Sequence, residues 1–160
     1  MAMSTDQHLA QLNVGYARHP LGDPRLAPFM GNLDRINALA ERSPGFVWRL
    51  QSDGGNATDI AVPGDDRMIS NLTVWKDVAS LGAFVFNTVH ARFYERRAAW
   101  FEAMAGPHFV MWPVPAGRRP DLVEAMDRLA CLRAHGSTDR AFGWDAVDAS
   151  AWRRCAHAAE

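Results

Sequence analysis

The chain has 160 residues, 48% of them hydrophobic, which fits one domain large enough to bury a real core. Seventeen basic and eighteen acidic residues give a formal charge of -1 without long blocks of either sign, so neither nucleic acid nor a membrane is an expected partner. The N-terminus lacks the basic start and apolar core of a secretory signal, and no run approaches the roughly 20 apolar residues of a spanning helix, so a cytoplasmic protein is expected.

The first half of the chain alternates strand and helix periods. Residues 8–16 change face at every position, which predicts a strand, and residues 26–40 carry apolar side chains at helical spacing until Ser43-Pro44-Gly45 ends the pattern. Residues 46–52 and 68–76 alternate again and predict two more strands. The stretch between these strands, DGGNATDIAVPGDDR, is rich in Gly and Asp, which predicts a mobile excursion that could act as a lid.

The second half predicts two further helices and a fourth strand. Asp77 can cap a long helix that begins near Val78 and ends around Ala105, with a kink near Gly82 or Asn87. The fourth strand covers residues 108–116, and its prolines restrict its far end to a sheet edge. An amphipathic helix follows over residues 120–136, started by an aspartate and stopped by a glycine. We divide the chain into a domain over residues 1–144 and a weakly patterned tail over residues 145–160.

This order predicts an α+β, ferredoxin-like β-α-β-β-α-β fold plus a C-terminal helix, with an antiparallel sheet and two helices on one face. The other face is expected to be apolar, because Trp48, Trp75 and Trp112 are spread over the strands. A second copy of the chain would cover that face. We therefore expect a homodimer, a dimeric α/β barrel whose interior could hold a small molecule.

Two groups of residues are candidates for chemistry. On the long predicted helix, one stripe contains His90, Tyr94, Arg97 and Phe101, beside an apolar stripe of Val89, Phe93, Trp100 and Met104. At this boundary an imidazole could ligate a haem iron or transfer protons, and the guanidinium could hold a carboxylate or a haem propionate. The alternative is a histidine held by a backbone carbonyl or by the neighbouring tyrosine, without any chemistry.

The second group lies on the strands, where one sheet face is predicted to carry Gln11, Asn13, Asn71, Thr73 and Trp75. Amides, a hydroxyl and an indole suit a pocket for a polar aromatic or polyketide-like substrate, or equally an ordinary dimer interface with its polar groups paired. His108 and Trp112 share a face of the fourth strand and could complete either version.

Several enzyme classes are disfavoured by the motifs that the sequence lacks. There is no glycine-rich phosphate loop, no GxSxG elbow and no HExxH, and Cys131 and Cys155 stand without metal-ligand spacing. Nucleotide enzymes, serine hydrolases, zinc proteases and disulfide frameworks are therefore not indicated.

The stretches NLTVWKDVASLGAFVFNTVHARFYERRAAWFEAM and FVMWPVPAGRRPDLVEAMDRLACLRAHGSTDRAFGW resemble a bacterial family known as a numbered domain of unknown function (DUF-3291-like). The resemblance covers about Leu9 to Trp144, and WPVPAGRRP and LRAHGSTDRAFGW are its most distinctive parts. It implies the dimeric α/β-barrel superfamily, whose relatives include antibiotic-biosynthesis monooxygenases and haem-degrading monooxygenases, some without any cofactor. Fold membership alone does not choose among these activities.

The haem-degrading branch is similar in having a strand-one asparagine and a helix histidine after a TVWK-like strand end, as Asn13, residues 73–76 and His90 do here. That branch has a tryptophan before its histidine, where this chain offers Leu81, Phe84 or Phe86. The resemblance implies a monooxygenase-like small-molecule enzyme in specialised or oxidative metabolism, or a non-catalytic binding or sensing barrel, with haem or no cofactor. The candidate catalytic residues are His90, Asn13 and Tyr94; the cofactor-binding residues are His90 and Arg97; the substrate-binding residues are Trp48, Asn71, Thr73, Trp75, Phe93, His108 and Trp112.

Overall fold

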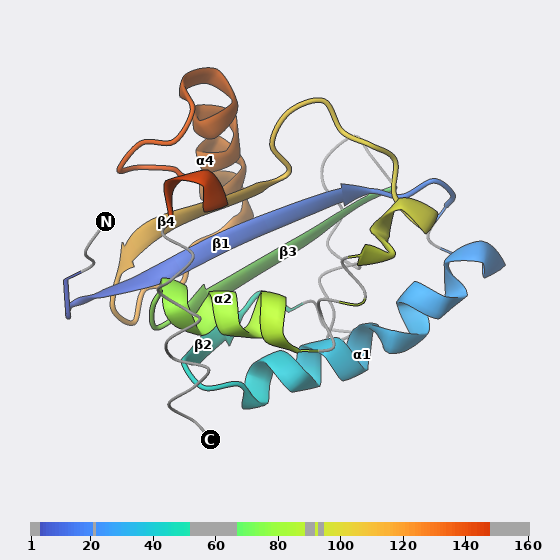
Figure 1. Cartoon of the computed structure of the whole chain (residues 1–160), viewed down its shortest axis with the longest axis horizontal. Coiled ribbons are helices and arrows are strands. Elements are labelled where there is room, and N and C mark those ends of the chain that lie inside the picture. The colour runs from blue at the N-terminus through green and yellow to red at the C-terminus, as the bar shows by residue number, and fades with distance from the viewer. Residues whose placement is uncertain (1–3, 21, 52–66, 89–91, 93–94, 148–160) are drawn as a thin grey trace.

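The helices and strands follow the predicted chain order, with one exception after residue 87. A computed structural model describes residues 4–20, 22–51, 67–88, 92 and 95–147 (Figure 1). Its strands and α-helices are β1 (Gln7–Tyr16), α1 (Ala27–Arg42), β2 (Phe46–Arg49), β3 (Met68–Trp75), α2 (Val78–Asn87), β4 (Phe109–Pro115) and α4 (Leu122–His135). Short 3-10 helices are η1 (Pro24–Leu26), η3 (Arg97–Ala99) and η4 (Trp144–Ala146).

The four strands form one antiparallel sheet in the order β2-β3-β1-β4. β1 is central and pairs along most of its length with β3 on one side and β4 on the other. Helices α1 and α2 follow the first and third strands, which is the ferredoxin-like arrangement, and α4 is added after it. The predicted α+β, ferredoxin-like fold class is therefore confirmed.

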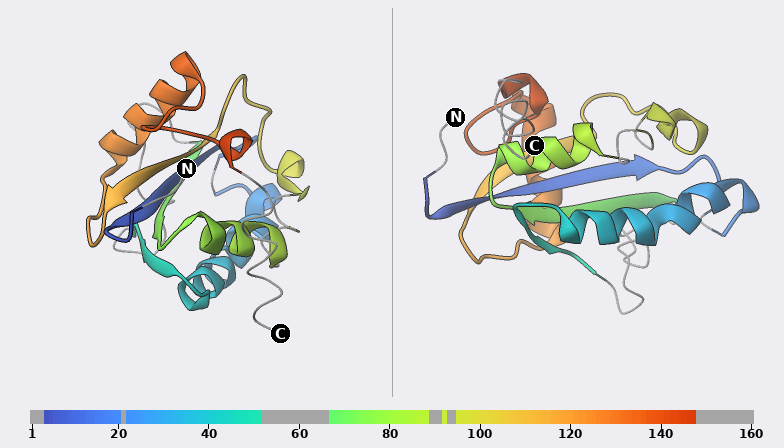
Figure 2. Two further views of the ribbon diagram at one scale, coloured as in Figure 1. Left: turned by 60° about the vertical axis from the view of Figure 1, so that its left-hand side comes forward. Right: turned by 60° about the horizontal axis from the view of Figure 1, so that its bottom comes forward.

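Both faces of the sheet are apolar, and helices cover both (Figure 2). What we call the α2 face packs against α1 and α2 and includes Leu9, Trp75 and Met111. The opposite α4 face packs against Ala125 and Leu129 of α4 and includes Ala10, Leu12, Val74 and Trp112. The expectation that the second face stays bare is wrong, because the third predicted helix folds back over it. Trp112 is 0% exposed within one chain, so no partner is needed to shield it.

α2 is shorter than predicted. Asp77 caps its start as expected, because the side-chain Oδ1 accepts the backbone N–H of Ser80 at 2.8 Å. The helix ends at Asn87, and Thr88 is extended, with φ -120° and ψ -177°. The Thr88 hydroxyl donates to the Phe84 carbonyl at 2.6 Å, so a side chain makes the bond that a further helical N–H would make. A continuous helix to Ala105 is therefore wrong.

The chain passes around the outer edge of β4 after α4. Asp121 caps α4 by accepting the Glu124 N–H at 2.8 Å, and Gly136 ends it at φ 71°. Met111 of β4 and Phe142 then exchange two backbone hydrogen bonds of 2.8 and 2.9 Å. This pairing protects the sheet edge and carries η4 from the α4 face to the α2 face.

Two predictions concern residues that the structure describes only in small part. The excursion over residues 53–67 lies outside the described residues except for Arg67, and the tail does so beyond Val147. The lid and the domain division at residue 144 stay predictions. Among the helices of the described ranges, none combines the length and the apolar character that crossing a bilayer requires.

Candidate functional site

A buried polar cluster lies on the α2 face, where β1 and β3 pair. The register places Gln11 opposite Thr73, so the Gln11 Nε2 donates to the Thr73 hydroxyl at 2.7 Å and to the Asn71 Oδ1 at 2.9 Å. The Trp75 Nε1 donates to the same hydroxyl at 2.9 Å. Asn71, Thr73 and Trp75 thus share one face and one hydrogen-bond network, as the alternation of residues 68–76 predicts.

This network is held rigidly. Gln11, Thr73 and Trp75 are 4%, 5% and 1% exposed. The Trp75 indole stacks on Phe84 of α2 at 5.2 Å between ring centroids and meets the edge of Phe46 at 5.4 Å. Buried donors that already have their acceptors are costly to move, so the cluster is a preorganised platform.

Asn13 lies beside this platform with hydrogen-bonding capacity to spare. Its Cα pairs with Asn71 on β3 and with Phe109 on β4, which places it at the centre of the α2 face. The side chain is half-buried, and no hydrogen bond joins its amide to any residue within the described ranges. An amide with one acceptor and two donors at this position can bind the carbonyl or hydroxyl group of a ligand.

Aromatic rings flank Asn13 on the β4 side. Phe109 stacks on Trp144 of η4, with ring centroids 5.3 Å apart and an interplanar angle of 12°. Phe86 of α2 meets the same indole edge-on at 5.0 Å. The 40% exposure of Phe86 shows that this group reaches solvent, so a planar apolar ligand could contact the rings from outside.

His108 immediately precedes β4, and its carbonyl accepts the Val14 N–H at 2.9 Å, so the alternation of the strand places its side chain toward the α4 face, opposite Phe109. The Arg97 Nη1 lies 3.5 Å from the His108 Nε2, and Arg133 of α4 donates from Nε to the Pro107 carbonyl at 2.8 Å. Partial burial lowers the pKa of His108, and the positive charges of Arg97 and Arg133 lower it further. The imidazole is therefore neutral at neutral pH and can accept a proton or a hydrogen bond.

The structure separates two predicted substrate-binding tryptophans from this group. Trp112 pairs with Ala10, and Trp48 pairs with Val74, so both indoles lie on the α4 face, opposite Thr73 and Trp75. The Trp112 Nε1 donates to Glu124 of α4 at 3.2 Å, which is a packing role. The prediction that either tryptophan joins the polar cluster in one pocket is wrong.

Arg97 and Phe101, the two described members of the predicted histidine stripe, do not lie on an α-helix. Arg97 belongs to η3, and Phe101 forms an isolated bridge with Ala17. His90, Phe93 and Tyr94 lie outside the described residues, so their predicted roles stay predictions. In the described ranges, no cluster of three or more His, Cys, Asp or Glu side chains could hold a metal ion.

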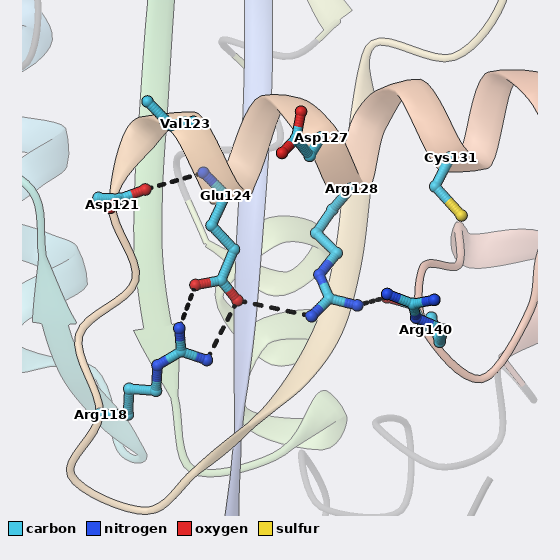
Figure 3. Close-up of a pocket in the computed structure, with 8 residues that line it drawn as sticks. All are labelled: Arg118, Asp121, Val123, Glu124, Asp127, Arg128, Cys131 and Arg140. Atoms are coloured by element: carbon cyan, nitrogen blue, oxygen red, sulfur yellow. Dashed lines mark hydrogen bonds and ion pairs between the residues drawn. The ribbon is translucent and has the colours of Figure 1, made fainter.

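A shallow groove of about 440 Å³ runs along the exposed side of α4 (Figure 3). Three arginines and three carboxylates line it together with Val123 and Cys131; the charged residues are Arg118, Asp121, Glu124, Asp127, Arg128 and Arg140. Glu124 accepts from Arg118 at 2.6 Å and lies 3.6 Å from Arg128. The groove is thus balanced in charge and lacks every predicted site residue, so we place the candidate site on the α2 face.

The sequence analysis missed two residues of this region. Trp144 lies in a stretch without strand or helix periodicity, and only its place in the distinctive LRAHGSTDRAFGW segment sets it apart. Arg133 reads as an ordinary basic residue in the last turn of α4. The contact of Arg133 with Pro107 depends on how α4 folds over the sheet, which no local pattern shows.

One of three comparisons with known proteins identifies the family, and the similarity to solved structures is weak. The family model described as Domain of unknown function (DUF3291) matches residues 8–157. Comparison with curated proteins gives no match. SnoaB, a cofactor-independent oxygenase from Streptomyces nogalater, is similar at 17% identity and a TM-score of 0.46, over 73% of this chain and 97% of its own. A protein of unknown function from Nitrosomonas europaea is similar at 15% identity and a TM-score of 0.46, over 74% of this chain and 99% of its own.

Proposed function

Since this chain belongs to the family described as Domain of unknown function (DUF3291), whose name states no activity, we propose a function from the site itself. The chain is a small-molecule enzyme of the monooxygenase-like class, acting in specialised or oxidative metabolism. Its substrate is a polar aromatic or polyketide-like compound bound on the α2 face. The observation that supports this most is the Asn13 amide, which has no hydrogen-bond partner among the described residues, beside the fixed network of Gln11, Thr73 and Trp75.

The chemistry follows from the groups available there. A ligand ring lying against Phe109 and Trp144 would bring its oxygen substituent to the Asn13 amide, which can donate to an oxygen that gains negative charge. Removal of a proton from such a ligand is assigned to His90, the predicted catalytic histidine, and not to His108, which is directed toward the α4 face. A deprotonated, electron-rich aromatic compound is itself a reductant for oxygen, so this arrangement suits oxygenation without a cofactor.

Haem ligation by His90, with Tyr94 and Arg97 beside the cofactor, remains a separate branch of this proposal. The test is the absorbance of the purified protein during haem titration. A Soret band that His90→Ala removes, and that exposed His135→Ala retains, would support ligation. A wild-type protein that stays colourless throughout would end the haem branch without touching the proposal for the α2 face.

Pairing of two copies also remains part of the proposal, although a bare sheet face is no longer a reason for it. A partner approaching the second sheet face would meet α4, not bare strands. Dimer formation is therefore not needed to cover bare strands on that face.

A non-catalytic binding or sensing barrel is the alternative. The observation that favours it is the internal pairing of Gln11, Thr73 and Trp75, which leaves those polar groups satisfied without a ligand. Under this alternative, the α2 face would hold a ligand tightly without turning it over.

Oxygen uptake distinguishes the two functions. The purified protein is given a panel of hydroxylated aromatic compounds in an oxygen electrode, and the enzyme proposal expects uptake with at least one. Asn13→Ala should lower kcat/KM by about a hundredfold, the usual effect of losing one oxyanion donor. The matched control is Asn32→Ala on the exposed side of α1, which should leave the rate unchanged. Tight ligand retention with no uptake would replace the enzyme with the binding module.

A further inference from the structure

The amide of Gln11 joins the polar residues of the α2 face into a network with a fixed direction. Its Nε2 donates to the Thr73 hydroxyl at 2.7 Å and to the Asn71 Oδ1 at 2.9 Å, so both of its hydrogens are used. The same Nε2 lies 3.4 Å from the Asn71 backbone carbonyl. A carbonyl oxygen can only accept, so the end of the Gln11 amide that faces it is the nitrogen. This contact therefore decides how the Gln11 amide is turned.

The orientation of Gln11 in turn fixes the orientation of Asn71. Because the Asn71 Oδ1 accepts from Gln11, the nitrogen end of the Asn71 amide is turned away from Gln11. Neither hydrogen of the Asn71 Nδ2 has a partner among the described residues. Asn71 is half-buried, whereas Gln11 is 4% exposed, so a ligand has better access to Asn71. The protein thus presents hydrogen-bond donors at this position.

The Thr73 hydroxyl is directed in the same sense. Its oxygen accepts from the Gln11 Nε2 and from the Trp75 Nε1, and an indole N–H can only donate. Both lone pairs of the hydroxyl are therefore used, and only its hydrogen is left. No acceptor for this hydrogen lies among the described residues. The free capacity of Thr73, like that of the Asn71 Nδ2, is a capacity to donate.

These donors lie where the apolar packing of the α2 face is interrupted. Leu9 at the start of β1 belongs to one apolar cluster, and Ala17 just after β1 belongs to another. Gln11 and Asn13 lie between them on the same side of the strand, and Asn71 is the cross-strand partner of Asn13. The Asn13 amide can turn either way, because no bond to a described residue holds it. Asn71 therefore sets the polarity that a ligand meets here.

We propose that Gln11 is a positioning residue, which holds Asn71 so that the α2 face selects a ligand with a hydrogen-bond acceptor. The chemical group selected is a carbonyl or a phenolate oxygen, in preference to a group that can only donate. A donor placed against the Asn71 Nδ2 would leave both groups unpaired, which is costly away from water. The location of the ligand rests on the proposed function, whereas the selectivity follows from the direction of the network.

Two bicyclic compounds of similar shape test this selectivity. The carbonyl of indanone only accepts, and the N–H of indole only donates. In NMR titrations of the full-length protein, indanone should bind about tenfold more tightly than indole, since the wrong polarity loses one hydrogen bond. Equal affinities, or failure of indanone to bind, would overturn the proposal.

Asn71→Asp reverses the polarity at the same shape. It keeps an oxygen for the Gln11 Nε2 but replaces the outward donors with a second carboxylate oxygen, so indole should now bind more tightly than indanone. The matched control, Asn32→Asp on α1, adds the same charge outside the network and should keep the wild-type preference. A preference for indanone that persists in Asn71→Asp contradicts the proposal.

Gln11→Leu separates positioning from support of the fold. Without the Gln11 amide, Asn71 is free to turn, and the ratio of the two affinities should fall toward one. A purely structural role would weaken both compounds equally and leave the ratio unchanged, which would refute positioning by Gln11.

Hydrogen–deuterium exchange of the wild-type side-chain amides gives a test that does not depend on how this variant folds. The Gln11 amide should be protected and the Asn71 amide should exchange quickly, and the reverse order would also refute the proposal. A preference for indanone without oxygen uptake would remove only the proposed oxygenase function.

Discussion

Thr73→Val tests whether the buried network of the α2 face is held by the Thr73 hydroxyl. Valine keeps the shape of the side chain but removes the acceptor used by the Gln11 Nε2 at 2.7 Å and the Trp75 Nε1 at 2.9 Å. Gln11 retains its 2.9 Å bond to Asn71, whereas Trp75 loses its acceptor while remaining 1% exposed. A buried donor left without a partner costs about 1 to 3 kcal/mol, so the free energy of unfolding should fall by about 2 to 3 kcal/mol.

Urea unfolding followed by far-ultraviolet circular dichroism measures this change, provided that the slope with urea is the same in all variants. Thr73→Ser is the matched control, because it keeps the hydroxyl and removes one methyl group. Its cost should be about 1 kcal/mol, as for other small buried deletions. The reasoning fails if Thr73→Val is as stable as Thr73→Ser, since the hydroxyl would then contribute nothing.

Three further predictions concern packing, capping and pH. Gly15→Ala should destabilise the protein by about 1 to 3 kcal/mol, because the added Cβ would lie 2.8 Å from the Phe101 ring. Gly31→Ala in α1 is the control: its Cβ meets nothing within 4 Å, so it should stabilise the protein slightly, and thermal melts compare the two variants. Asp77→Ala removes the α2 cap and should lower the free energy of unfolding, measured in urea, by about 1 kcal/mol. Asp77→Asn can still cap the helix and should retain most of that stability. His108 has a lowered folded-state pKa, so stability should fall as pH drops below 6.5, and His108→Gln should flatten that slope; an unchanged slope would contradict the burial of the imidazole.

Strand and helix types were predictable because their periods are local. The alternation of residues 8–16 and 68–76 also predicted which side chains share the α2 face, and the network around Thr73 agrees with it. The end of α2 at Asn87, in place of the long helix predicted after Val78, was not predictable in the same way. The composition of this stretch favours a helix throughout, but the Thr88 hydroxyl donates to the Phe84 carbonyl, and Phe101, past η3, forms a bridge with Ala17, the residue after β1.

The site was harder to predict because it depends on register. Alternation within one strand separates its side chains into two sets, but it does not show which set lies on the same sheet face as a given set of the neighbouring strand. A register shift of one residue exchanges the two sets. Trp112 and Trp48 were therefore placed with Trp75, although the pairing with Ala10 and Val74 puts both on the α4 face. The covering of that face depends on where α4 folds back, which is likewise a tertiary property.

The central claim is that ligands bind on the α2 face beside Asn13, and the side-chain amide region of a proton–nitrogen NMR spectrum tests it most directly. Hydroxylated aromatic compounds are titrated into the labelled protein, with Asn13→Ala and Asn71→Ala used to assign the two amide signals. The account predicts that both signals shift on binding and that Asn13→Ala weakens the affinity. Shifts confined to the backbone amides of the α4 groove in the same spectrum, with both side-chain amides unmoved, would contradict it.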